Sequence, residues 1–474
     1  MTTLEANPPT THPPPTPASS DARRGFAFAD SRARYALYAI CFGFFLVLLD
    51  TTALNVAIVA MQREFGGAIG GLQWVVNSYT VVFAAFLLTC GALGDRFGAR
   101  RLYVLGLLLF TGMSGLCALS PGVGFLIGAR MLQGLGAAIM LPASLSLLSH
   151  AFPHPEEKAR AVAFWASIVS LGFAAGPALG GVLTYYLGWR SIFWLNVPVG
   201  LAALAMVRHF VDETRVPNPR RIDWAGQACV SLALFALTYG LIDAGSAGWA
   251  APRVVGAFAL AALLAAGFVF CERISSSPVL PGGLFHNRNF SIFVTTGLIL
   301  NFGMYGTLFI ESIYLQNTRH LSALASGLMI LPFTVLPTIT TRLIVGYSGR
   351  QYIRRRLAIG QLFSALGAVA LALAFWSAGY GAILGGLGLM GVGMGCIMPA
   401  MTAGVLSSST PATSGLASGV LNSARQVGGT IGVALMGTLV QGYQDRGFLW
   451  SLGIILVCFL AMAWLTLRVV KDPA

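Results

Sequence analysis

Long apolar stretches separated by short polar segments run along nearly the whole chain, from residue 35 to residue 468. A bilayer core about 30 Å thick is crossed by roughly 20 helical residues. No water satisfies exposed backbone groups in lipid, so segments of this kind must be helical. The sequence therefore predicts an all-α protein that crosses a membrane fourteen times. The predicted spans are 35–59, 73–93, 102–120, 122–149, 160–187, 190–211, 224–243, 253–271, 290–315, 323–347, 356–377, 380–406, 415–441 and 447–468.

The positive charges divide unevenly between the two sides of these spans. With the N-terminus inside, the inner segments carry 21 Lys and Arg residues, the outer segments carry five and the spans carry three. Segments rich in Lys and Arg stay in the cytoplasm. The predicted location is the cytoplasmic (inner) membrane, with multiple passes and both termini in the cytoplasm.

Composition supports a membrane protein and changes the meaning of the net charge. Hydrophobic residues make up 56% and charged residues only 9% of the chain, whereas soluble domains carry about 25% charged residues. The formal net charge of +13 comes from loop residues along one membrane face, where anionic lipid is the natural partner. The sequence thus predicts contact with membrane lipid and no nucleic-acid binding. The first 34 residues are polar and proline-rich, which predicts a disordered tail rather than a signal peptide.

The loops exclude several classes of function. The longest internal ones, 212–223 and 272–289, are too short for a soluble catalytic or nucleotide-binding domain, and no GxxxxGK[ST] motif occurs anywhere. No catalytic cluster stands at either membrane face. We therefore expect that the protein is not an enzyme, that it needs no cofactor, and that any active transport draws on an ion gradient.

Two short patterns suggest other chemistry but fit the membrane fold better. His150 and His154 resemble a metal site, but Pro153 and Pro155 break any helix that would place both rings on one face. The glycines of a GxGxxG pattern at 386–391 lie within a span, where small residues let helices approach closely. We expect no metal site and no dinucleotide site.

A charged motif lies between the second and third spans, where the chain reads GALGDRFGARR. It matches the GxxxDRxGxRR loop signature of the major facilitator superfamily of secondary transporters, which the chain therefore resembles. The resemblance implies that the aspartate caps the cytoplasmic N-terminus of a helix from the opposite half, which is favourable by typically 0.3–1 kcal/mol. The arginines would hold the inner gate. Such a latch favours the outward-facing state. Its residues here are Gly91, Asp95, Arg96, Gly98, Arg100 and Arg101.

The fifth span carries a second motif, GFAAGPALGG, which resembles the antiporter pattern GxxxGPxxGG. Gly172, Gly176 and Gly180 recur every four residues and form a smooth face for another helix. Pro177 removes a backbone hydrogen bond, so it bends the helix, and Gly181 completes the motif. Within this resemblance the pattern is typical of proton-driven exporters rather than sugar symporters.

Further stretches extend the resemblance to roughly residues 35–470. Residues 130–138 resemble RxxQGxGxA and residues 49–57 resemble LDxTxxNVAL, while 189–200 and 221–226 are typical of the fourteen-helix drug:proton antiporter branch. The second half lacks an aspartate where a copy of the latch would stand, at 346–354.

The fold implied by the resemblance is the major facilitator fold, with two six-helix bundles and two inserted central helices. The expected units are a disordered cytoplasmic tail (1–34), an N-terminal six-helix bundle (35–211), a two-helix linker insert (212–289), a C-terminal six-helix bundle (290–468) and a cytoplasmic tail (469–474).

Two opposite charges lie deep within the first bundle. Asp50 is about 22 Å from the inner end of the first span, and Arg130 is about 12 Å from the outer end of the fourth. These depths overlap, so the two side chains are expected to meet. One interpretation is a fixed ion pair that joins two helices. The other, favoured by the family resemblance, is a proton-coupling carboxylate whose pairing changes with proton or substrate occupancy.

A substrate cavity is also predicted, lined by Asn55, Gln133, Glu311 and Arg425. Glu311 stands about four residues from the outer end of its span, so it either lines the cavity or reaches the membrane interface. In the cavity it would supply a negative charge for a cationic drug. Arg425 lies deep in span 415–441, with either a cavity or a structural role.

These observations favour a proton-coupled exporter of hydrophobic, cationic compounds, working by alternating access around a site between the bundles. Its partners would be small-molecule substrates, protons and membrane lipid, with a periplasmic adaptor as a further candidate. A dedicated exporter of one metabolite is the first alternative. A membrane enzyme or a non-transporting sensor is the second.

Overall fold

The computed structural model describes residues 31–66, 69–214, 223–275, 282–345, 352–376, 379–410 and 413–470. The predicted N-terminal tail up to residue 30 and the segment 346–351 lie outside these residues. The α-helices are α1 (Ser31–Phe65), α2 (Ile69–Phe97), α3 (Ala99–Ala118), α4 (Val123–Ala151), α5 (Pro155–Leu187), α6 (Arg190–Phe210), α7 (Trp224–Ala247), α8 (Pro252–Ile274), α9 (Arg288–Ile313), α10 (Ala323–Val345), α11 (Ile353–Trp376), α12 (Tyr380–Ser407) and α13 (Ser414–Val469). A 3₁₀ helix, η1 (Gly282–His286), precedes α9, and a π-helix, η2 (Tyr314–Thr318), follows it.

Thirteen of the described helices are long and apolar enough to cross a membrane. The last, α13, has 56 residues, which is about 84 Å at 1.5 Å per residue and far more than one bilayer. Its backbone is non-helical at Gln444 (φ 49°, ψ −121°), where two helices join. The described helices therefore supply fourteen membrane-length segments in the predicted order. The predicted fold class, an all-α membrane protein, is confirmed.

Several helices extend beyond the predicted spans. The first begins at Ser31 and ends at Phe65, and α5 begins at Pro155. The expectation of a loop for the GALGDRFGARR motif was wrong, because α2 continues to Phe97 and α3 begins at Ala99. Only Gly98 separates them. Its φ of 101° is strained for residues with a Cβ atom, so glycine allows a sharp turn in one residue.

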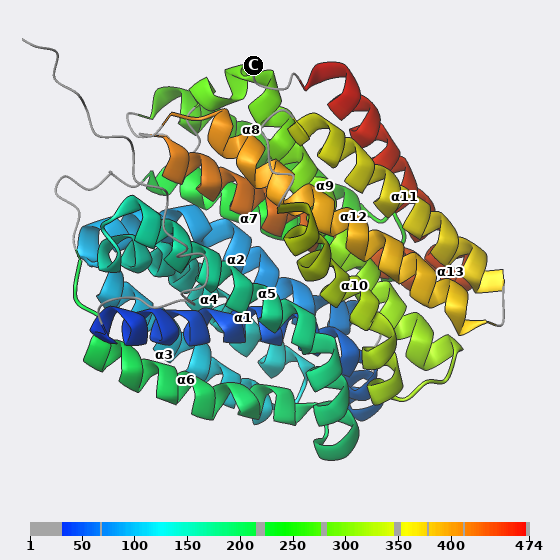
Figure 1. Ribbon diagram of the computed structural model, residues 1–474. Helices are drawn as coiled ribbons and strands as arrows, with labels where there is room; N and C mark the ends of the chain where they lie inside the picture. Colours follow the sequence, from blue (N-terminus) through cyan, green and yellow to red (C-terminus); the bar gives the residue numbers. More distant parts are fainter. Residues whose placement is uncertain are drawn as a thin grey trace, which may run out of the picture.

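The helices form two packed groups, a first half (α1–α6) and a second half (α9–α13) (Figure 1). Two helix pairs provide the main contact between the halves, α5 with α10 and α2 with α13. The two inserted helices lie beside this contact, since α7 packs on both α2 and α13 while α8 packs on α7. We call the end of the array where α1 begins proximal and the end where α1 terminates distal.

Hydrogen bonds join the two halves near the distal end. Gln73, in the first turns of α2, donates to the carbonyl of Ala434 in α13 at 2.7 Å. Gln316 of η2 donates to the carbonyl of Val56 in α1 at 2.9 Å. Both glutamines are buried. The distal ends of the halves are thus closed against each other.

Candidate functional site

The glycines of α5 position α1, which carries Asp50. A Cβ atom at Gly172 would lie 2.8 Å from the carbonyl oxygen of Phe45, and one at Gly180 would lie 2.6 Å from that of Ala53. One at Gly176 would overlap the side chain of Thr52. The smooth glycine face therefore packs directly on the α1 backbone.

The same motif also contacts the second half. A Cβ atom at Gly181 would lie 2.8 Å from the carbonyl oxygen of Ala323, at the start of α10. The carbonyl of Pro177 lies against Gly327 of α10. The motif thus holds α5 between α1 and α10, at the boundary of the two halves.

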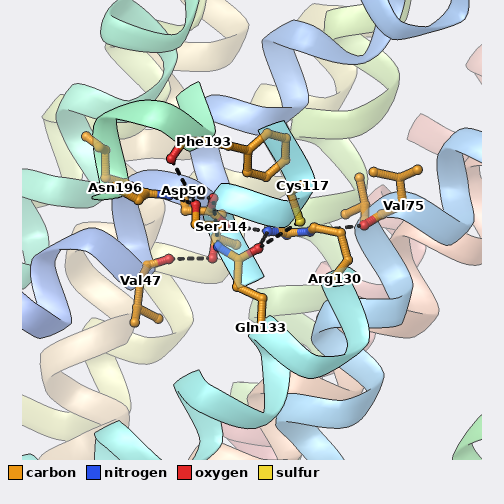
Figure 2. A network of polar contacts seen from close by, with 12 residues as sticks. Val47, Asp50, Val75, Ser114, Cys117, Arg130, Gln133, Phe193 and Asn196 are labelled. Atoms are coloured by element: carbon orange, nitrogen blue, oxygen red, sulfur yellow. Dashed lines mark hydrogen bonds and ion pairs between the residues drawn. The ribbon is translucent and has the colours of Figure 1, made fainter. Parts of the chain in front are cut away.

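Asp50 and Arg130 form an ion pair in the interior of the first half (Figure 2). Their side chains are 0% and 1% exposed. The predicted contact between Asp50 and Arg130 is therefore present in the structure. Isolated buried charges cost several kcal/mol each, so they persist only with well-placed partners.

Two side-chain amides join Arg130 in donating hydrogen bonds to the carboxylate of Asp50. The Nδ2 group of Asn196, in α6, donates to Asp50 Oδ1 at 3.0 Å, and Gln133 Nε2 approaches the same oxygen at 3.3 Å. Ser114, in α3, accepts a bond of 3.0 Å from Asn196 and donates to the carbonyl of Phe193, also at 3.0 Å. Together with Arg130 and its contacts, the network around the carboxylate therefore draws on α2, α3, α4 and α6 as well as α1.

Arg130 has partners that do not depend on Asp50. Its Nε donates to the carbonyl of Val75 at 3.3 Å and its Nη1 donates to Gln133 Oε1 at 2.8 Å. The guanidinium carbon lies 4.2 Å from the centre of the Tyr79 ring, a cation–π contact worth about 2 kcal/mol when desolvated. The arginine can therefore remain held when the charge of Asp50 changes.

The network includes one residue predicted for the substrate cavity and adds residues that the sequence did not indicate. Gln133 was expected in a substrate cavity, and it is fully buried between Asp50 and Arg130. Asn196 and Ser114 were not predicted as site residues. Both are polar residues within apolar spans, which is the signal that would have identified them.

Asn55 is buried on α1, one helical turn after Thr51. Its Nδ2 donates to the carbonyl of Thr51 at 2.9 Å. Its Oδ1 is buried without a hydrogen-bond partner among the described residues. The side chain keeps one free acceptor inside the first half.

Glu311 does not reach the membrane interface, so this alternative was wrong. The helix continues through η2 to Thr318, and Glu311 is 1% exposed. Neither carboxylate oxygen has a hydrogen-bond partner among the described residues.

Arg425 is half-buried on α13. Its Nε donates to Asn301 Oδ1 of α9 at 3.3 Å, and its Nη1 lies 3.5 Å from Asn422 Oδ1. Its described hydrogen bonds go to amides within the second half.

The basic end of the latch motif is held by the first half itself. The Glu213 carboxylate accepts hydrogen bonds from the backbone N–H groups of Arg100 (3.1 Å) and Arg101 (3.2 Å), at the start of α3. Its Oε2 also lies 3.5 Å from Arg101 Nε. Arg100 Nη2 donates to the carbonyl of Arg208 in α6 at 2.6 Å. Glu213, a residue that the sequence did not indicate, thus caps α3.

The other latch residues lie in the last turns of α2. Asp95 is half-buried and Arg96 is exposed, with its guanidinium carbon 5.6 Å from the Phe97 ring centre. Gly91 faces α4, where a Cβ atom would lie 3.6 Å from Pro142 Cβ.

Two halves of membrane-spanning helices, with a buried charge network inside one of them, have the architecture of a membrane transporter. The model of the Major Facilitator Superfamily matches residues 40–433. The chain belongs to this superfamily.

Known relatives share most of the chain. It is 37% identical over 409 residues to "Multidrug resistance protein Stp" of Mycobacterium tuberculosis, covering 86% of this chain and 76% of that one. It is 34% identical over 423 residues to "Methylenomycin A resistance protein" of Bacillus subtilis, covering 87% and 89%. Among solved structures, the peptide transporter POT superposes with a TM-score of 0.69 at 16% identity, covering 91% of this chain and 94% of that one. This last likeness concerns the fold.

Proposed function

We propose that the protein is a proton-coupled drug efflux transporter of the cytoplasmic membrane, in the fourteen-helix drug:proton antiporter branch. It would export hydrophobic, cationic compounds by alternating access between its two halves. The names of the relatives, which concern resistance to drugs and to an antibiotic, support a drug as the substrate class. Its partners would be the exported compounds, protons and membrane lipid, and the proton gradient would take the place of a cofactor.

The observation that carries the coupling part is the buried pair of Asp50 and Arg130. Protonation of Asp50 removes the negative partner of the arginine but leaves Val75, Gln133 and Tyr79 in place around it. Because α1 packs on the glycine face of α5, and α5 packs on α10, a rearrangement of α1 is passed to the boundary of the halves. This gives proton binding a mechanical route to the conformational change.

The latch residues are assigned a supporting role. Asp95 would cap a helix of the second half on the cytoplasmic side and favour the outward-facing state. Arg100 and Arg101 would fix the turn at Gly98 through their contacts with Glu213 and Arg208. Asn55 and Arg425 remain proposed cavity residues.

A susceptibility panel tests the function. The full chain, expressed in a host without its own efflux pumps, should protect against several unrelated cationic dyes and quaternary ammonium compounds, and a protonophore should abolish that protection. Asp50→Asn should also abolish it at equal protein level. Asp243→Asn is the matched control, since Asp243 is paired with Arg253 near a helix end.

A dedicated exporter of one antibiotic is the second candidate, favoured by the single compound in the name of the Bacillus relative. It predicts protection against one compound of the panel and none of the others. Protection that survives the protonophore would contradict the proton-coupled function in either form.

A further inference from the structure

A second acidic residue lies inside the membrane-spanning part of the protein, and the network of Asp50 does not include it. Glu311 stands on α9 in the second half, about 10 Å along the helix from Thr318. It is 1% exposed, and both carboxylate oxygens are buried without a hydrogen-bond partner among the described residues. An ionised carboxylate in such a place costs far more than a neutral one. The geometry therefore favours the protonated acid in this conformation.

Among the described residues, no charged side chain bonds to the Glu311 carboxylate. The helix packs against α1, α10, α12 and α13. On α13, Arg425 bonds to Asn301, which precedes Glu311 by ten residues, or about 15 Å along α9. On α1, Asp50 is paired with Arg130. Arg319, directly after η2, donates to the Tyr314 hydroxyl at 2.8 Å and to the Ala374 carbonyl at 3.1 Å. The other described charged residues of these helices stand towards helix ends or beside the break at Gln444: Arg32, Arg34, Arg63 and Glu64 on α1, Arg342 on α10, and Asp445, Arg446 and Arg468 on α13.

The segment after Glu311 is part of the distal closure. The π-helix η2 begins three residues later, and Gln316 within it bonds to the α1 carbonyl of Val56. Tyr314 stacks on Phe448 with ring centres 4.5 Å apart, which seals this end with apolar surface. π-helical turns occur frequently at functional sites. Separation of the distal ends would break the Gln316 contact and expose the region of Glu311 to the outside.

We propose that Glu311 is a second proton-binding site, which takes up a proton when the distal end is open and keeps it through the distally closed conformation described here. The inference rests on the proposed function and deepens it. If Asp50 and Glu311 each exchange one proton, a cycle imports two protons for one exported monovalent cation, and one net positive charge moves inward. Without Glu311 the exchange is one proton for one cation, and no net charge moves.

The first test needs no transport. Infrared difference spectra between neutral and alkaline pH are recorded on the purified full-length protein, and the readout is the C=O stretch of a protonated carboxyl group. Glu311→Gln, which keeps the shape of the neutral acid, should lose part of this band. Asp243→Asn, whose wild-type carboxylate is paired with Arg253 at 2.6 Å, should keep all of it. An unchanged band in a folded Glu311→Gln protein would overturn the proposal.

The second test measures charge movement. In proteoliposomes, exchange of the monovalent cation ethidium for protons is driven by a pH gradient, with or without a potassium and valinomycin potential. The potential should accelerate wild-type exchange and lose its effect in Glu311→Gln, while the pH gradient still drives both. Equal potential dependence in the two proteins would refute the second site. A wild type that ignores the pH gradient contradicts the proposed function instead, and the infrared band still decides whether Glu311 binds a proton.

Discussion

Each half of the molecule buries a carboxylate, and the two are treated in opposite ways. Asp50 accepts hydrogen bonds from an arginine and two amides. Glu311 has no hydrogen-bond partner among the described residues. A saturated carboxylate is stable as an anion, whereas an unpaired one is stable as an acid. Burial alone therefore does not define the role of an intramembrane acid, because its donors decide which protonation state the fold favours.

The largest expected effect on stability comes from removing the hydrogen-bonded carboxylate of Asp50. Asp50→Ala leaves Arg130 buried without its carboxylate, and removal of one partner of a buried pair costs about 3–5 kcal/mol. Thermal unfolding of the purified protein should show a clear drop in Tm. Asp212→Ala is the control, since its ion pair with Arg32 is exposed and exposed pairs contribute only about 0–1 kcal/mol. Equal Tm values for the two variants would show that the network does not stabilise the first half.

Glu311→Gln should have a much smaller effect on stability than Asp50→Ala. It replaces one neutral group by another of the same shape, and no described hydrogen bond is lost. The measurement is again the Tm of the purified protein, which should match that of the wild type. A drop as large as that of Asp50→Ala would mean that the carboxylate is ionised and paired.

Gly176→Ala tests the packing that connects the network to the second half. The added methyl group would overlap the side chain of Thr52 and lie 3.1 Å from the Ala53 nitrogen, and such overpacking costs typically 1–3 kcal/mol. We expect lower stability and slower drug export. Gly128→Ala, where a Cβ atom meets nothing within 4 Å, should leave both unchanged. Equal export by the two variants would contradict close α1–α5 packing.

Glu213→Gln should slow export less than Gly176→Ala does. It removes the charge that caps α3, which is worth about 0.3–1 kcal/mol near a helix N-terminus, while the amide retains one acceptor. Export should slow modestly at unchanged protein level. Asp212→Asn, at the exposed neighbouring ion pair with Arg32, should export at the wild-type rate. A loss that is equal in both variants would assign the effect to surface charge rather than to the cap.

The sequence predicted well how deep each residue lies in the membrane, but it predicted poorly which face of its helix the residue occupies. Hydropathy gave the order and number of membrane segments, and helix rise gave overlapping depths for Asp50 and Arg130. Neither hydropathy nor helix rise shows which neighbouring helix a side chain faces. Asn196 was therefore not recognised as a partner of Asp50, although it contacts the same carboxylate oxygen as Gln133.

Helix ends were the second source of error. Hydropathy falls at the membrane surface, but α9 continues through η2 to Thr318, so a residue placed near the interface is buried. Glu213 lies beyond a predicted span, and its role depends on how α6 ends beside the start of α3. Such contacts between loop residues depend on tertiary packing, which hydrophobic periodicity does not describe.

The most direct test of the account is uphill transport by Asp50→Asn. Wild-type and variant proteins are reconstituted in proteoliposomes, and accumulation of ethidium against its own gradient is measured under an imposed pH gradient. We predict that the wild type concentrates the dye, whereas the folded variant only equilibrates it. A permanently neutral side chain at position 50 separates the rearrangement of α1 from proton binding, and a proton at Glu311 alone does not restore that link. Uphill accumulation by Asp50→Asn that still collapses with a protonophore would contradict the assignment of Asp50 as the coupling carboxylate.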